Sequence, residues 1–204
     1  TYTAKFVKSA EVVEFQNAAK AWTYENVDSA TLKDSYTVST KEEMSYLAYA
    51  VNSLGVDFSG KTVTLTANLK YTDAEEYTPI GDSNTAFAGT FDGGNMTISG
   101  IRLVNYIRYA GIFGNSSGTI KNLNAADCYI QGSNSTSSGM VGIIAGEGRT
   151  IENCTVTNST VGGGFAGLVV GHSNALNVKV VTVDNCTINQ TWKRGGVVGY
   201  VGGN

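Results

Sequence analysis

This 204-residue chain contains very little proline, histidine and charge for its length. Pro79 is the one proline and His172 the one histidine, and charged residues make up 15% of the chain. The net charge of −3 argues against a nucleic-acid partner, because binding phosphates requires clustered lysine and arginine. No apolar run approaches the roughly 20 residues of a membrane helix, so no membrane span is expected.

Cysteine is also scarce, with three residues and no CxxC spacing. An odd number at such spacing indicates neither a disulfide framework nor a zinc site, so we expect no metal and no cofactor. What is abundant is glycine, with 25 residues, together with Asn, Thr and Ser. These residues favour tight turns, and the composition therefore predicts a β-rich protein.

A seven-residue pattern, Thr-Ile-x-Asn in its commonest form, recurs along the chain. Its copies begin at Thr97, Thr119, Thr150 and Thr182, which are 22, 31 and 32 residues apart. Repeats of this period are typical of solenoids. The sequence therefore predicts an all-β fold, a parallel β-helix (β-solenoid).

Within each copy the apolar residues are spaced by three and then by two, as in Ile151, Cys154 and Val156. A flat strand keeps a period of two, so the extra residue must lie in a bend. That residue is Gly100, Asn122, Asn153 or Asn185, and Gly and Asn tolerate a left-handed backbone. We therefore expect a corner of the coil at these positions, with the asparagines stacked in one ladder and Cys154 and Cys186 stacked inside.

A second repeated element is an apolar run between glycines, as in Gly111-Ile-Phe-Gly114 and Gly167-Leu-Val-Val-Gly171. These runs read as buried strands on another side of the coil. Near the N-terminus, Ser39-Thr-Lys-Glu42 reads as a capping box and predicts a helix over 39–54 that caps the solenoid. Residues 1–38 read as a lead-in, with a helix or a strand between 10 and 22, and residues 39–204 as the β-helix.

The chain from about residue 35 resembles the GLUG-motif β-helix proteins. The resemblance rests on Tyr77-Thr-Pro-Ile-Gly81, on Phe87-Ala-Gly-Thr-Phe-Asp-Gly93 and on the glycine-bounded runs, with GLUG-like repeats from about 87 onward. It implies a right-handed parallel β-helix in a secreted or surface-attached bacterial protein, usually non-catalytic, with adhesion or glycan contact as its role. The last run, Gly195 to Asn204, is the front half of a repeat, so we expect that the chain belongs to a longer protein or that its last coil packs on a partner.

Candidates for chemistry are few. Glu152 and Asp184 occupy equivalent positions in successive copies, and we interpret them as part of a solvated charged face. The alternative is a catalytic pair one coil apart, at the carboxylate separation of retaining glycosidases. His172 lacks the aspartates that a pectin hydrolase would place around it, and Asp92 reads as a turn residue. Two alternatives to a binding module remain open: an enzyme that acts on polysaccharides, and a passive spacer.

We favour a non-catalytic extracellular module that binds a glycan or a surface protein. An aromatic ring beside hydrogen-bond donors suits a sugar. The candidate ligand residues are Trp192 and Arg194 near the C-terminus, and Tyr106 and Tyr109 in the middle of the chain.

Overall fold

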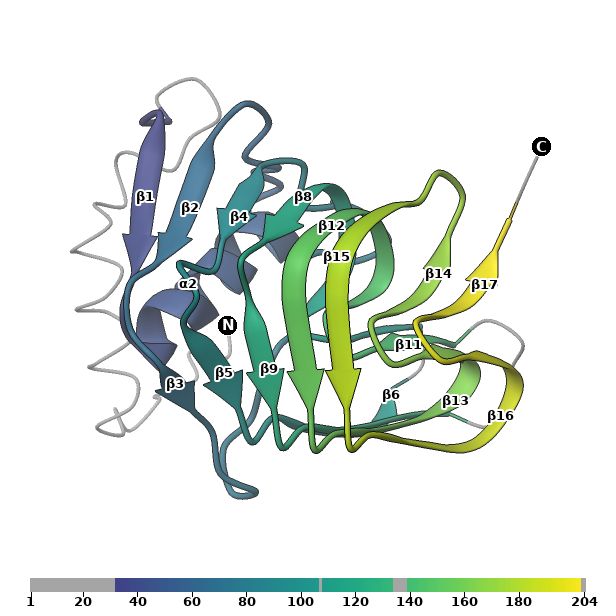
Figure 1. Cartoon of the computed structure of the whole chain (residues 1–204). Coiled ribbons are helices and arrows are strands. Elements are labelled where there is room, and N and C mark those ends of the chain that lie inside the picture. The colour runs from purple at the N-terminus through teal and green to yellow at the C-terminus, as the bar shows by residue number, and fades with distance from the viewer. Residues whose placement is uncertain (1–31, 107, 134–138, 203–204) are drawn as a thin grey trace, which may run out of the picture.

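The computed structural model describes residues 32–106, 108–133 and 139–202. This part of the chain winds into a parallel β-solenoid of about six turns with one short helix near its N-terminus (Figure 1). The predicted fold class is confirmed. The segment between 10 and 22, for which a helix or a strand is expected, lies outside the described residues, as does the rest of 1–31.

The strands form two parallel sheets, of eleven and six strands, that wrap around one core. Each strand pairs with a strand of the next coil, as in the register Ile120 to Ile151 to Val178. The strands are β1 Ser35–Val38, β2 Thr62–Leu65, β3 Leu69–Lys70, β4 Thr90–Asp92, β5 Thr97–Ser99, β6 Arg102–Tyr106, β7 Tyr109–Ala110, β8 Phe113–Lys121, β9 Asn124–Ala126, β10 Tyr129–Gly132, β11 Met140–Gly142, β12 Ala145–Thr157, β13 Thr160–Gly167, β14 Val170–Ser173, β15 Asn177–Asp184, β16 Thr187–Gly195 and β17 Val198–Val201.

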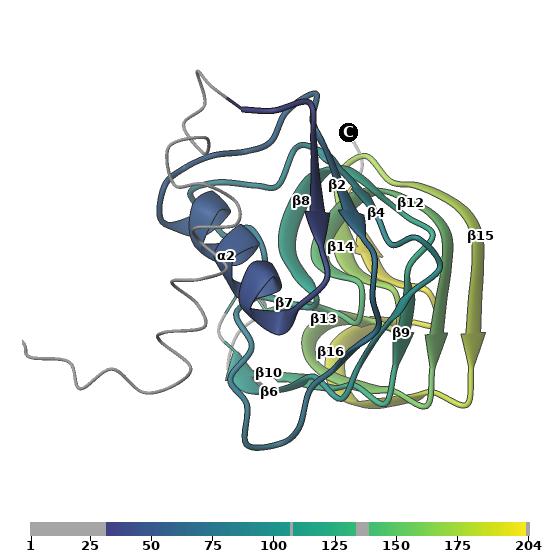
Figure 2. The same ribbon diagram turned by 90° about the vertical axis from the view of Figure 1, so that its left-hand side faces the viewer.

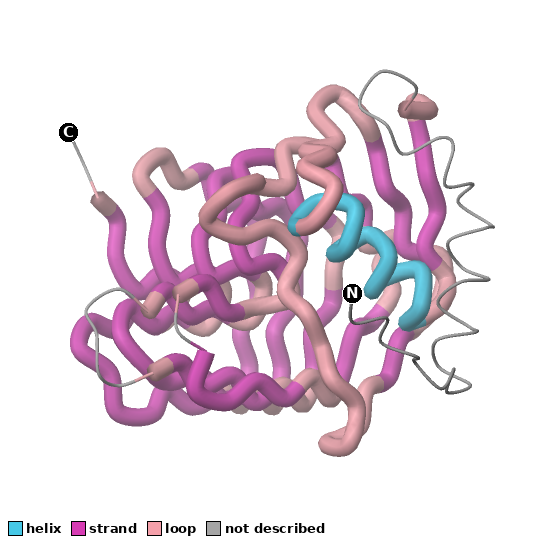
Figure 3. Tube along the Cα trace, turned by 180° about the vertical axis from the view of Figure 1, so that it is seen from behind, coloured by secondary structure: helices cyan, strands magenta, loops and turns pink. Residues whose placement is uncertain are grey.

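The helix α2, Lys41–Asn52, lies against the first coils at the N-terminal end of the solenoid (Figures 2 and 3). It buries Met44, Leu47 and Val51 in the common core. Its capping box is formed by Thr40 and Glu43, one residue later than predicted, because Thr40 has the extended backbone of an N-cap residue. Ser35–Val38, at the end of the expected lead-in, is strand β1 and pairs with β2.

The predicted corners exist, but they form two separate rows. All of the expected corner residues have the left-handed backbone, with φ of 53° at Asn122, 51° at Asn153, 49° at Asn185 and 75° at Gly100. The side chain of Asn153 donates to Asn122 Oδ1 at 2.8 Å, whereas that of Asn185 donates to Asn158. The prediction of one asparagine ladder was therefore wrong.

The reason is that one motif is used at two corners five residues apart. Thr150 pairs with Asn177, and Thr155 pairs with Thr182, so the copy at Thr182 lies one corner further along the coil than the copy at Thr150. Likewise Thr97 pairs with Asn124, five residues after Thr119. The intervals of 22 and 32 residues therefore do not equal the length of one coil. They differ from it by the five residues that separate the two corners.

This register separates two predicted pairs. Cys154 pairs with Val181, whereas Cys186 lies in register with Cys128 two coils earlier. The expected stack of Cys154 on Cys186 is therefore wrong. The three thiols are free, and burial raises the pKa of Cys128 and of Cys154 to about 11. A raised pKa keeps these two thiols protonated and unreactive at neutral pH.

The glycine-bounded runs, defined here as the re-entrant turns, are 111–114, 142–146, 167–171 and 195–199. The tips of the first three point into the core, where Ile112, Ile143 and Val169 are completely buried, whereas Val197 in the last turn is exposed. The segment that enters a turn and the segment that leaves it are here called its arms, and the arms are in backbone contact. A Cβ on Gly146 would lie 2.6 Å from the amide nitrogen of Ala110, and one on Gly171 would lie 2.3 Å from that of Val141. The runs are therefore sharp inward bends and not the strands that the sequence indicated, and glycine is required where the arms meet.

Candidate functional site

The re-entrant turns create a surface feature that runs along the solenoid, here called the seam. Just outside each pair of glycines, one residue from each arm faces its counterpart on the other arm. One side of the seam is the row Tyr109, Met140, Phe165 and Lys193, paired strand to strand. The other side is the row Asn115, Glu147, His172 and Tyr200. With strands about 4.8 Å apart, four of them give the seam a length of about 15 Å.

The C-terminal half of the seam is an aromatic cluster. The ring of Phe165 lies 5.1 Å from that of Tyr200, 6.0 Å from that of His172 and 6.0 Å from that of Trp192. The rings of His172 and Tyr200 stack at 5.5 Å with an angle of 24° between their planes. Trp192 is 68% exposed and Tyr200 37%, so this cluster presents ring surface to solvent.

His172 is the buried polar member of this cluster, with 7% of its surface exposed. Its Nδ1 has no hydrogen-bond partner among the described residues, and it faces Glu147 Oε1 at 3.7 Å. Glu147 also accepts a long hydrogen bond of 3.4 Å from Asn174. The imidazole is therefore held mainly by the rings that flank it, with one carboxylate nearby.

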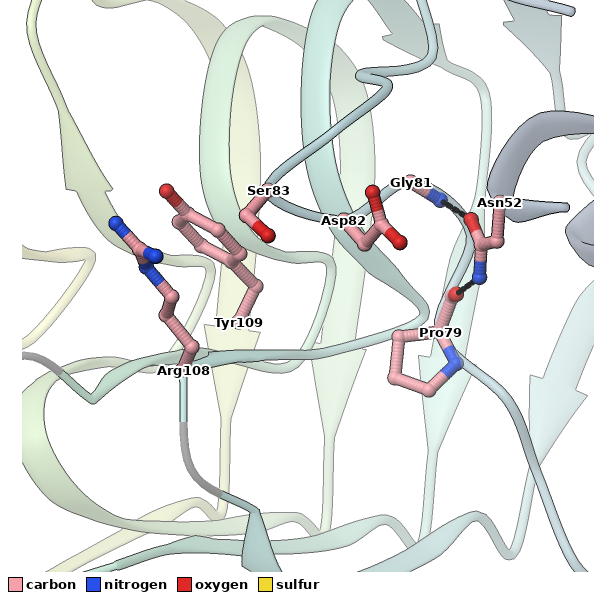
Figure 4. Close-up of a pocket in the computed structure, with 7 residues that line it drawn as sticks. All are labelled: Asn52, Pro79, Gly81, Asp82, Ser83, Arg108 and Tyr109. Atoms are coloured by element: carbon pink, nitrogen blue, oxygen red, sulfur yellow. Dashed lines mark hydrogen bonds between the residues drawn. The ribbon is translucent and has the colours of Figure 1, made fainter. Parts of the chain in front are cut away.

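The N-terminal end of the seam opens into a small pocket of about 120 Å³ (Figure 4). Asp82, Ser83, Arg108 and Tyr109 line its mouth, and the side chain of Asn52 fixes one wall by bonding to the backbone at 79 and 81. Sites that enclose small molecules usually measure 300–1,000 Å³. This pocket therefore suits one projecting group of a larger ligand and does not suit a ligand that is buried whole.

Two cations lie over rings along the seam. The guanidinium of Arg108 is 5.4 Å from the centre of the Tyr109 ring, and Lys193 Nζ is 3.9 Å from that of Tyr200. Four lysines elsewhere, for example Lys121 and Lys179, form ion pairs with carboxylates instead. Within the described ranges no ion pair involves Arg108 or Lys193, so both retain donors for a ligand.

The predicted ligand residues are only partly brought together. Tyr109 and Trp192 lie at opposite ends of the same seam, whereas Arg194 is exposed on β16 opposite the buried Ala166. Tyr106 ends strand β6, and its side chain lies outside what the structure describes. Phe165 and Tyr200 were not predicted from the sequence, and His172 was considered there only as a catalytic residue. The signal was present, because each lies immediately after, or two residues before, a glycine of a re-entrant turn.

The alternative of a catalytic pair formed by Glu152 and Asp184 is excluded by the strand register. Glu152 pairs with Lys179, whose Nζ lies 2.9 Å from its Oε1, and Asp184 pairs in register with Thr157. Asp92 accepts hydrogen bonds from the backbone of Gly94 and from Asn122, which agrees with a turn residue.

The described residues also contain no group of three or more His, Cys, Asp or Glu side chains arranged to hold a metal ion. In the same ranges, no helix is both long and apolar enough to cross a membrane.

Comparisons with protein-family models, with curated proteins and with solved structures gave no match to this chain. The resemblance to the GLUG-motif proteins therefore remains a prediction from the sequence. The fold and the seam are the observations from which a function can be argued.

Proposed function

We propose that this chain is a non-catalytic module on the outside of a bacterial cell that binds glycans along the seam. The observation that carries the proposal is the row of rings that ends at the exposed Trp192 and Tyr200. Sugars present apolar C–H faces to aromatic rings and hydroxyls to nearby polar groups. Lys193 and Glu147 stand beside these rings and supply a donor and an acceptor.

The rigidity of the frame supports the same proposal. The seam side chains stand on strands that are paired coil to coil, and the glycines of the turns fix the distance between the two sides. A preorganised surface loses little entropy on binding. The seam runs across successive coils, so a linear chain of sugars is the ligand shape that fits it, with the pocket beside Tyr109 receiving one projecting group.

A glycan array on the purified protein tests this function. We expect Trp192→Ala and Tyr200→Ala to abolish binding of the glycans that the unaltered protein retains. Tyr129→Ala is the matched control. Like Tyr200, Tyr129 has a cation over its ring, Arg102 at 4.5 Å, but it lies on β10, away from the seam. An array without any retained glycan, or equal losses in all three variants, would contradict the proposal.

An enzyme acting on polysaccharides is the second candidate, and one observation favours it. His172 Nδ1 faces Glu147 Oε1, which is the arrangement of a base and the carboxylate that orients it. The contacts of His172 with the rings of Phe165 and Tyr200 and its 7% exposure restrict the access of a substrate. Release of reducing ends or unsaturated products from pectins or glycosaminoglycans, lost in His172→Ala, would establish the enzyme in place of the binding module.

A further inference from the structure

The pocket beside Tyr109 has one basic and one acidic wall. Arg108 and Tyr109 stand at the start of β7, and Asp82 comes from the loop between β3 and β4 (Figure 4). Among the residues that the structure describes, neither Arg108 nor Asp82 takes part in an ion pair. Both charges are therefore available to a group that enters the pocket.

The acidic wall is held in place by its own loop. Asp82 Oδ1 accepts hydrogen bonds from the backbone nitrogen of Asn84 at 2.7 Å and from that of Thr85 at 3.0 Å. The other carboxylate oxygen, Oδ2, has no hydrogen bond to a described residue, so it can accept one from a ligand. Gly81 fixes the same loop, because a Cβ there would collide with the carbonyl oxygen of Asn115.

The basic wall is fixed through the backbone. The carbonyl oxygen of Arg108 accepts a hydrogen bond of 2.6 Å from the amide of Met140, and the guanidinium lies 5.4 Å from the centre of the Tyr109 ring. The rest of the lining includes the Tyr109 ring and Pro79, whose carbonyl oxygen is held by Asn52 at 2.9 Å. The pocket thus offers a donor, an acceptor and apolar surface, all on positioned groups.

Walls of opposite charge select a neutral group. An anion is attracted by Arg108 but repelled by Asp82, and a cation experiences the reverse, whereas a dipolar group with both a donor and an acceptor satisfies the two walls. The volume of about 120 Å³ equals that of about four water molecules at about 30 Å³ each. This space is too small for a whole sugar ring. An acetamido substituent fits it, with an N–H donor, a carbonyl acceptor and a methyl group.

We propose that the pocket binds the acetamido group of an N-acetylated amino sugar. Asp82 accepts a hydrogen bond from the N–H of the acetamido group, and Arg108 donates one to its carbonyl oxygen. The methyl group packs on Pro79 and on the ring of Tyr109. This inference rests on the proposed function and names the class of sugar, because it requires that the glycan along the seam contains N-acetylated amino sugars.

Titration calorimetry of the whole chain with matched oligosaccharides tests the proposal. The probe is a linear tetrasaccharide of N-acetylglucosamine, and the comparison ligands are the glucosamine and glucose tetrasaccharides with the same linkage. We expect the acetylated probe to bind at least about tenfold more tightly than either, because its loss leaves charged groups of the pocket unpaired. Saturation transfer from protein to ligand in NMR should be strongest at the acetyl methyl protons.

Two substitutions in the walls make the test specific. Asp82→Asn keeps the turn, since asparagine accepts the same backbone bonds, but it replaces the free acceptor with a donor. Arg108→Met removes the donors and keeps an apolar side chain. In each variant the acetylated and glucose tetrasaccharides should bind within about twofold of each other. Arg102→Met is the matched control, because Arg102 is also exposed beside a ring, that of Tyr129 at 4.5 Å, but lies outside the pocket. It should keep the full preference.

The glycan array separates a failure of this inference from a failure of the proposed function. Glycans retained on the array without a preference for the acetylated probe would overturn the acetamido pocket and leave glycan binding in place. A preference that survives both wall substitutions would have the same meaning, because the acetyl group would then be bound elsewhere. An array that retains no glycan would overturn both proposals.

Discussion

Val180 occupies a backbone conformation that its side chain disfavours. It takes the corner position that Asn153 holds one coil earlier, with a φ of 49° against 51° at Asn153. A left-handed backbone costs most residues about 1–2 kcal/mol, and β-branched residues are true outliers there. Val180 is 77% exposed, so little packing compensates for this strain. We therefore predict that Val180→Asn stabilises the last coil.

The expected gain is the sum of two effects. Relief of the strain contributes about 1 kcal/mol, because asparagine enters this conformation readily. The new amide can donate to Asn153 as Asn153 donates to Asn122 at 2.8 Å, which adds at most about 0.5 kcal/mol at an exposed site. The loss of the valine contacts is small, since only about a quarter of its surface is covered. The net prediction is about 1–1.5 kcal/mol.

Hydrogen exchange of the β15 amides is the appropriate assay, because the terminal coil of a solenoid can open before the whole protein unfolds. A gain of 1.4 kcal/mol slows exchange through that opening about tenfold. Val201→Asn is the matched control, since Val201 is 52% exposed on the same coil and lies in an ordinary strand. Exchange that is no slower in Val180→Asn than in Val201→Asn would refute the argument from strain.

Three further predictions concern the frame of the solenoid. Gly146→Ala should lower the free energy of unfolding in urea by about 3 kcal/mol or more, because its Cβ would meet backbone atoms at 2.6–2.8 Å. The control Gly196→Ala, whose Cβ would have nothing within 4 Å, should change that free energy by less than about 0.5 kcal/mol. Burial raises the pKa of Asp92, but hydrogen bonds from Asn122 and Gly94 and the charge of Lys121 together hold that pKa below its usual value. The stabilisation from Asp92 is therefore complete above the unfolded pKa of about 3.9 and is lost as pH falls through the folded pKa, so the stability of Asp92→Asn should fall less between pH 5 and 2 than that of the unaltered protein. Iodoacetamide at pH 8 should modify the half-exposed Cys186 first and should modify the two buried thiols only after unfolding, as mass spectrometry of the digested protein would show.

The corner residues illustrate how far the sequence could be interpreted. The spacing of three and then two around Asn153 predicted a bend with a left-handed backbone, because side-chain alternation and the tolerance of asparagine are local properties. The assignment of the copies to coils failed, since a corner looks the same wherever it lies on the coil. Only the strand register shows that Asn185 follows Asn158 and not Asn153.

The candidate site was likewise predicted only in part from the sequence. Trp192 and Tyr109 were found as exposed-looking rings, but the seam that contains them was not predicted. The glycine-bounded runs read as strands because an apolar run has no period that distinguishes a buried strand from a sharp buried bend. The approach of the two arms, which places Phe165 against His172, depends on contacts between residues that the sequence pattern does not connect.

The sequence alone determined the solenoid, its corners and its buried rows, because these depend on the periodicity of apolar residues and on the conformational freedom of Gly and Asn. The tertiary structure decided which copies share a coil, which residues face each other across the seam, and where apolar and charged side chains remain uncovered. These properties depend on the length of each coil and on the re-entrant turns that bend into the core. Both arise from packing between coils, which a repeat motif does not encode.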